Sequence, residues 1–253
     1  KKTQIEHILL RPDTYIGSID VQSQNMWVLD PTSSQIVYKP CSFVPGLYKI
    51  FDEIIVNAAD NKQRDIKMNK IEVTLNAEEN FIKVWNNGKG IPVAMHQEHK
   101  VYVPELIFGY LLTGSNFDDD EEKTTGGRNG FGAKLANIFS SKFIIETADS
   151  SRELKYKQEF SQNMSKRGAP KINKYGGTDY TCVTFYPDLA KFKMTKLDED
   201  ILSLLSKRVY DLAGTNIARG HKLNVYLNGA KIEARTFEKY VGMYQGLEEP
   251  VAF

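Results

Sequence analysis

The amino-acid sequence predicts an α+β fold: a two-layer α/β sandwich with helices packed on one face of a mixed, largely antiparallel sheet. Strand patterns outnumber helical patterns, and most neighbouring strand patterns are joined by turns short enough for hairpins. Strands and helices do not alternate as in a doubly wound parallel sheet, so a two-layer arrangement fits better. No internal repeat and no linker rich in Pro, Ser or Gly divides the 253 residues. We therefore expect a single domain over 1–253.

Four segments have the apolar period of helices. After Pro45, apolar residues recur every three or four positions as far as Ala58, which is the spacing of one buried helical face. A second long pattern begins at Leu197 and is expected to end near Gly214, because glycine commonly follows the last turn of a helix. Shorter helices are expected over residues 104–112 and 133–139.

Strands are expected where apolar residues alternate, or run continuously, over the length of a strand. Asn228-Gly229 follows the last of these patterns and is the strongest hairpin signal in the chain, because this dipeptide suits the tight turns between antiparallel strands. The expected strands cover residues 71–75, 82–85, 143–147, 154–160, 180–186 and 223–227.

The charged residues are nearly balanced. The sequence has 33 Lys and Arg and 32 Asp and Glu, a formal net charge of +1. This balance excludes a globally basic nucleic-acid binder, and we expect little direct contact with DNA. No apolar run approaches the ~18 residues that a membrane span needs, so no membrane partner is expected. Cys41 and Cys182 lie far apart, match no metal-binding spacing and indicate no disulfide framework.

A carboxylate and two amides share one edge of the helix that follows Pro45. At ~100° per residue, Glu53, Asn57 and Asn61 fall within about an 80° arc beside the apolar face. A solvated helix edge would explain them too. Polar groups so close to a buried face need hydrogen-bond partners, however. A bound ligand could be the partner of these three side chains.

A tight turn follows the strand expected over 82–85. Asn86 offers one acceptor and two donors to the edge of a flat polar ligand, and glycines at 88 and 90 permit the turn. An ordinary Asn-Gly turn is the alternative. Further along, the segment from Gly126 to Lys134 is rich in glycine but matches neither a Walker A loop nor a dinucleotide-binding motif. It could be a surface loop, or it could bring backbone N–H groups at a helix start to an anion.

In this order and spacing, these groups resemble the GHKL class of ATP-binding domains. The sequence is most similar to the N-terminal ATPase domain of eukaryotic type II DNA topoisomerases, and the resemblance covers essentially the whole chain. It implies the GHKL fold and ATP hydrolysis. The segments that carry it are Arg11–Gly17, Phe51–Asn61, Leu112–Asp120 and Gly126–Lys134.

The resemblance implies a role for each matching residue. Glu53 would be the general base, Asn57 the Mg²⁺ ligand and Asn61 a neighbour of the ribose. Asn86 would read the adenine, with the hydroxyl of Thr181 in support. Ser115 and Asn116 would contact the nucleotide, and the phosphate lid would comprise Gly127, Arg128, Asn129, Gly130, Phe131, Gly132, Ala133 and Lys134, the lysine being the phosphate cation.

Three positions depart from the wider class. Asn86 stands where much of the class has Asp, so a neutral hydrogen bond would replace a charge-assisted bond to the adenine amine. Asn61 stands where bacterial relatives carry an acid, and Gly114 where Ser is common. The first two differences resemble the eukaryotic branch and disfavour a gyrase.

The resemblance also implies the setting of the domain. Its cofactors would be ATP and Mg²⁺, and Mg-ATP would drive homodimerisation of a gate coupled to DNA strand passage and relaxation of supercoils in the nucleus. We expect the link toward a transducer domain to begin near 237–253. The transducer lysine, the DNA-cleaving tyrosine and most of the DNA contacts would lie beyond Phe253, so weak turnover is expected from this region alone.

Two other functions stay open. His7 to Pro12 faintly resembles the phosphoacceptor box of a histidine kinase, but too few residues separate it from Glu53 for a dimerisation hairpin and a separate domain. The chain could also hold a nucleotide without hydrolysing it. Phosphate on His7 would favour the first alternative, and background turnover in a longer protein would favour the second.

Overall fold

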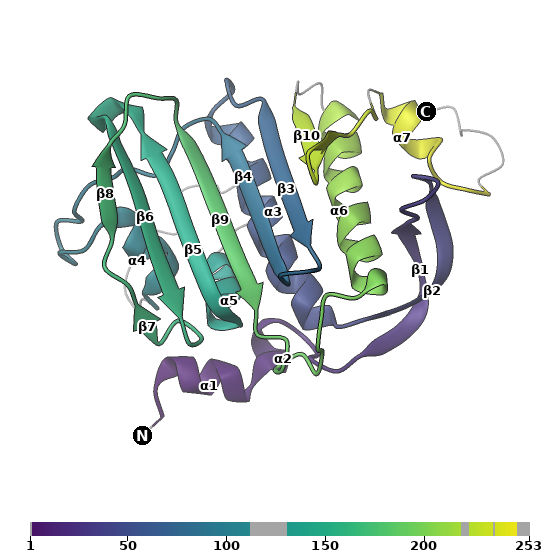
Figure 1. Cartoon of the computed structure of the whole chain (residues 1–253), viewed down its shortest axis with the longest axis horizontal. Coiled ribbons are helices and arrows are strands. Elements are labelled where there is room, and N and C mark those ends of the chain that lie inside the picture. Colours follow the sequence, from purple (N-terminus) through teal and green to yellow (C-terminus); the bar gives the residue numbers. More distant parts are fainter. Residues whose placement is uncertain (1, 112–130, 219–222, 235, 247–253) are drawn as a thin grey trace, which may run out of the picture.

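The computed structural model describes residues 2–111, 131–218, 223–234 and 236–246. It has the two layers that the sequence predicts, a broad sheet with helices behind one of its faces (Figure 1). Within the described residues, no helix combines the length and the apolar character needed to cross a membrane.

The main sheet has nine strands in the order β11-β10-β3-β4-β9-β5-β6-β7, and β8 pairs with β6. Its pairs are antiparallel except for β10 and β3, which run parallel, so the sheet is mixed and largely antiparallel as predicted. The strands are β3 (Lys70–Asn76), β4 (Phe81–Asn87), β5 (Ser140–Asp149), β6 (Leu154–Ser161), β7 (Lys166–Arg167), β8 (Lys171–Lys174), β9 (Tyr180–Pro187), β10 (Asn224–Leu227) and β11 (Ala230–Lys231).

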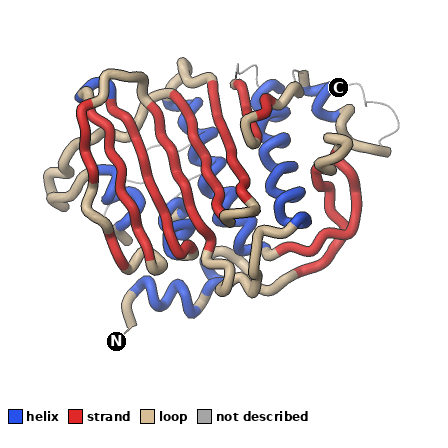
Figure 2. Tube along the Cα trace, in the orientation of Figure 1, coloured by secondary structure: helices blue, strands red, loops and turns tan. Residues whose placement is uncertain are grey.

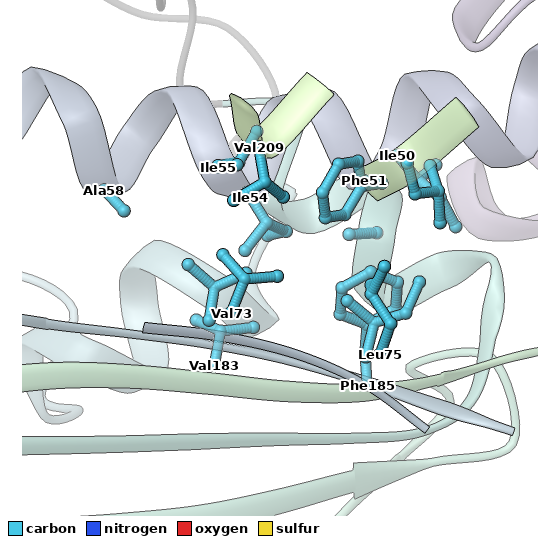
Figure 3. Close-up of a cluster of buried hydrophobic side chains, with 14 of the residues drawn as sticks. Ile50, Phe51, Ile54, Ile55, Ala58, Val73, Leu75, Val183, Phe185 and Val209 are labelled. Atoms are coloured by element: carbon cyan, nitrogen blue, oxygen red, sulfur yellow. The ribbon is translucent and has the colours of Figure 1, made fainter. Parts of the chain in front are cut away.

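The long helix α3 (Pro45–Arg64) packs its apolar face on the inner face of this sheet. Ile54 and Ala58 are buried and point toward Val73 of β3 and Val183 of β9 (Figure 3). Full burial of each large aliphatic side chain stabilises the fold by roughly 1.5–3 kcal/mol. Two short helices, α4 (Val103–Gly109) and α5 (Gly132–Ile138), cover the sheet beside α3.

A further group of elements lies beside the main sheet. Here α6 (Glu199–Ala218) packs against α3 and against a separate two-stranded sheet, β1 (Gln22–Leu29) with β2 (Ile36–Phe43) (Figure 2). The guanidinium of Arg208 on α6 donates to Asp52 of α3 at 2.7 Å. The sequence did not predict the β1–β2 hairpin, nor the short elements α1 (Gln4–Leu10), α2 (Pro12–Tyr15), η1 (Ser150–Arg152) and α7 (Phe237–Val241).

The expected end of α6 near Gly214 is wrong, because the helix continues to Ala218. Gly214 instead provides room for a neighbour: a Cβ at this position would lie 2.3 Å from Cγ of Tyr240, whose ring packs against the helix from α7. The Tyr240 hydroxyl donates to Asp211 Oδ1 at 2.6 Å. The glycine is therefore required by close packing between α6 and α7 rather than by the backbone turn of a helix end.

We expect Gly214→Ala to destabilise the protein. Alanine gains about 1 kcal/mol of helix propensity, but forcing a methyl group into the Tyr240 ring costs typically 1–3 kcal/mol. A net loss of up to about 2 kcal/mol in urea unfolding is the expected result. Gly176→Ala is the matched control, because a Cβ there meets nothing within 4 Å. Equal stability of the two variants would contradict this reading of Gly214.

Candidate functional site

A cavity of about 710 Å³ lies between α3, the inner face of the sheet and the helices α4 and α5. Its polar lining comes from separate parts of the sequence, which the fold brings together. The residues predicted for the site that line it are Glu53, Asn57, Asn61, Asn86, Phe131, Gly132, Ala133 and Thr181.

The edge of α3 supplies three of these side chains. Because the apolar residues of the helix are buried against the sheet, the flanking row faces the cavity. Glu53 Oε1 pairs with the ammonium group of Lys49 at 2.5 Å, one turn earlier. Asn57 is exposed and makes no hydrogen bond within the described part of the chain. Asn61 Nδ2 donates to the carbonyl of Lys89 at 3.3 Å, which links the helix to the turn after β4.

Gly132 packs directly against the carboxylate of Glu53. A Cβ on residue 132 would lie 1.9 Å from Glu53 Oε2, so no larger residue fits there without moving the acid. The glycine begins α5 and follows Phe131. The contact thus joins the end of the glycine-rich segment to the carboxylate that the sequence places in the same site.

At the other end of the cavity, Asn86 and Thr181 lie opposite each other on β4 and β9. Asn86 is only 4% exposed and donates through Nδ2 to the carbonyl of Asn87 at 2.9 Å. The rest of the Asn86 amide, which can still form hydrogen bonds, and the Thr181 hydroxyl lie at the cavity wall. This pair suits a planar polar ligand.

Thr147 on β5 supports this pair and was not predicted from the sequence. Its fully buried hydroxyl accepts from the Ile91 amide at 2.9 Å, donates to the Tyr180 carbonyl at 2.9 Å and lies 3.4 Å from the Thr181 hydroxyl. Strand alternation places Thr147 on the inner face, but only the pairing of β5 with β9 brings it opposite Thr181.

The turn after β4 is held by three further constraints. Gly88 has φ +91°, a conformation that favours glycine, and a Cβ at Gly90 would lie 1.9 Å from the carbonyl oxygen of Ala148. Asp65, just after α3, accepts from the Lys89 amide at 2.8 Å. The sequence pointed to the glycines but not to Asp65, because nothing in the local pattern indicates a contact across this distance.

Asp149 anchors the segment that leaves the turn. Its carboxylate accepts from the Val93 amide at 2.9 Å and from Arg152 at 2.8 Å. Burial disfavours the charged form, but hydrogen bonds from Ser151, Val93 and Arg152 outweigh it and lower the pKa of Asp149 below its ordinary value. The carboxylate is therefore ionised at neutral pH and keeps the cavity wall in place.

Apolar side chains form most of the remaining cavity wall, which Asp60, Arg64, Lys89 and Gly90 complete. A largely apolar pocket with a few converging polar groups is the usual form of a small-molecule site. The apolar lining comprises Ile54, Ala58, Val84, Ile91, Pro92, Ile107, Phe108, Leu135 and Val183.

Lys134 does not line the cavity with its neighbours in sequence. It is 7% exposed, and desolvation lowers the pKa of its ammonium group. Its assignment as the phosphate cation therefore stays a prediction. Ser115, Asn116, Gly127, Arg128, Asn129 and Gly130 lie outside the described residues, and their roles are also untested predictions.

The donor set near α3 suits a magnesium ion only together with a ligand. Among the described residues, no three His, Cys, Asp or Glu side chains gather as a metal site. Asn57 offers one hard amide oxygen toward the cavity. Mg²⁺ prefers oxygen and often takes one or two protein ligands plus phosphates and water, so the residues present fit a nucleotide-bound Mg²⁺.

Thr147→Val is expected to destabilise the fold by about 1–3 kcal/mol. Valine has nearly the same shape, but it leaves the Ile91 amide and the Tyr180 carbonyl without a hydroxyl partner. Denaturant unfolding measures the loss. Thr184→Val, on the outward face of β9, is the control and should change stability by less than about 0.5 kcal/mol. A Thr147→Val protein as stable as this control would contradict the structural role of the hydroxyl.

Comparisons with known proteins agree with this geometry. The chain is 57% identical to human DNA topoisomerase 2-alpha over 244 residues and 56% identical to Drosophila melanogaster DNA topoisomerase 2. Each alignment covers 96% of this chain but 16% and 17% of the relative, so the chain spans about a sixth of their length.

Solved structures are also similar. The ATPase region of Saccharomyces cerevisiae topoisomerase II superposes with a TM-score of 0.90 at 53% identity, covering 96% of this chain and 64% of that one. The ATPase and transducer domains of Balamuthia mandrillaris DNA topoisomerase II give 0.89 at 49%, covering 97% and 63%. The family model described as "Histidine kinase-, DNA gyrase B-, and HSP90-like ATPase" matches residues 44–190, more than half of the chain. The chain therefore belongs to this family of ATPases.

Proposed function

We propose that this chain binds ATP with Mg²⁺ in the cavity and hydrolyses it, as the ATPase domain of a type II DNA topoisomerase. One observation carries the proposal: the carboxylate of Glu53, the amide of Asn57 and the Asn86–Thr181 pair line the same cavity. It thus holds an acid, a metal-binding oxygen and a planar hydrogen-bonding edge, which are the groups that nucleotide hydrolysis needs.

The adenine binds at the sheet end of the cavity. Asn86 presents its amide to the polar edge of the base, and the Thr181 hydroxyl adds a second contact. Apolar walls such as Val84, Ile91 and Val183 cover the faces of the ring. Asn61, the last of the three cavity-facing side chains of α3, is the neighbour of the ribose.

Glu53 acts on the water that attacks the terminal phosphate. Its carboxylate accepts a proton from that water and orients it in line with the bond to be broken. Gly132 and Lys49 hold the carboxylate in position. Asn57 holds Mg²⁺ through its amide oxygen; the ion, when bound, neutralises charge on the phosphates. Most of the rate enhancement then comes from positioning and electrostatic stabilisation.

The remaining predicted residues complete the phosphate end. Ser115 and Asn116 contact the nucleotide, and Lys134 supplies positive charge. The segment Gly127, Arg128, Asn129, Gly130, Phe131, Gly132 and Ala133 closes over the phosphates as a lid. Support comes from Phe131, Gly132 and Ala133, which line the cavity next to Glu53.

In the longer protein, ATP binding drives homodimerisation of an N-terminal gate. The gate couples nucleotide turnover to DNA strand passage and to relaxation of supercoils in the nucleus. The similarity to DNA topoisomerase 2 over 96% of this chain supports this setting. We expect weak turnover from this region alone, as the resemblance to type II DNA topoisomerases implies.

Glu53→Gln tests the proposal. The amide cannot accept a proton from water, so turnover of Mg-ATP should fall by roughly 10²–10⁴-fold, the usual contribution of a general base, while analogue binding stays within about threefold of wild type. Phosphate release and isothermal titration measure the two quantities, best in a protein that includes the downstream domain.

Glu238→Gln, exposed on α7, is the control and should hydrolyse ATP at the wild-type rate. Undiminished turnover in Glu53→Gln would remove this residue as the base. Background turnover in the wild-type protein would instead favour a module that binds nucleotide without hydrolysing it.

A further inference from the structure

The face of the sheet opposite the helices is open. Figure 1 looks onto this face, and no described helix of the chain covers it. Its outward strand positions alternate with the buried inward ones. The outward charged residues are Lys70, Lys83, Lys142, Lys155, Lys157, Lys166, Lys171 and Lys231, with Glu72, Glu146 and Glu159.

The small net charge of the chain hides this distribution. Eight lysines and three glutamates give the open face a formal charge of +5, whereas the whole sequence carries +1. All other residues together therefore carry −4. A small net charge predicts little contact with DNA only if positive and negative charges are spread evenly over the surface. The fold instead gathers an excess of positive charge on this one face.

Three of these lysines pair with the three glutamates. Lys70 lies beside Glu72, Lys157 lies 3.0 Å from Glu146, and Lys142 lies 3.7 Å from Glu159. The other five make no ion pair with any described residue, and three of the five lie on β4, β6 and β8. These three are Lys83, Lys155 and Lys171, and we call them the open lysines.

Aromatic rings on the same face support the lysine side chains. The ammonium nitrogen of Lys70 lies 4.7 Å from the ring centre of Tyr226 and 5.6 Å from that of Trp85. Lys142 lies over Tyr186 at 5.2 Å. Cation–π contacts of this kind hold the ammonium groups above the sheet. They also occupy the ring faces on which unpaired bases would otherwise stack.

We propose that this face binds double-stranded DNA through its phosphates, without reading sequence. A rigid, lysine-rich surface neutralises a row of phosphates, and compact ammonium groups do so without the paired hydrogen bonds that recognise bases. Neighbouring strands of a sheet lie about 4.8 Å apart, so the open lysines together span several phosphates of one duplex. The choice of DNA rests on the proposed function, but the surface is separate from the ATP cavity on the other face.

Fluorescence anisotropy with a 5′-labelled duplex of about 20 base pairs tests this. The triple variant Lys83→Gln, Lys155→Gln, Lys171→Gln should bind at least tenfold more weakly than wild type at low salt. The slope of log K against log salt should fall by about 3, roughly one for each lysine that no longer neutralises a phosphate. Lys2→Gln, Lys196→Gln, Lys239→Gln removes the same charge from exposed positions off the face and should retain most of the affinity.

Three outcomes would overturn the proposal. Equal losses in the two triple variants would mean that net charge, not this face, sets binding. Tighter binding of the single strand of the same length would assign the surface to base stacking. Wild-type protein that binds no duplex at low salt would leave the face without this role. Thermal stabilisation of each variant by a magnesium–nucleotide analogue is measured in parallel, so that failure of the ATP site is distinguished from failure of the open face.

Discussion

The packing of α3 against the inner face of the sheet is the constraint on which the rest of the structure depends. Residues such as Ile54 and Ala58 bury one side of the helix, which orients the polar edge beside them into the cavity. Glu53 and Asn57 are therefore directed by the core rather than by their own contacts. The Asp52–Arg208 pair then joins this helix to α6 from its other side.

Close contacts of glycine and backbone complete the site around that helix. Gly132 brings the start of α5 onto the Glu53 carboxylate, and Gly90 brings the turn after β4 onto β5. Asp65 and Thr147 tie the same turn to α3 and to the sheet. Close packing and hydrogen bonds thus tie the described wall of the cavity together, which suits a reaction that depends on positioning.

The sequence predicted what repeats along the chain and missed what depends on pairing between distant segments. The apolar period of α3, the central strands and the Asn228-Gly229 hairpin were predicted and are confirmed. Thr147 was missed because its role follows from the register of β5 with β9. Gly214 was misread because a packing glycine and a helix-ending glycine look alike in one sequence. Net charge, likewise, says nothing of which face carries the lysines.

Thermal unfolding with Mg²⁺ and a non-hydrolysable ATP analogue tests the central claim most directly, beside Asn57→Ala. A ligand at 100 times its Kd stabilises by ~2.7 kcal/mol, which raises Tm by roughly 5–11 °C for a domain of this size. We predict a rise of that order in the wild-type chain and a clearly smaller one in Asn57→Ala, whose exposed side chain contributes little to stability. An equal rise in both proteins would contradict the claim that the edge of α3 binds the magnesium–nucleotide.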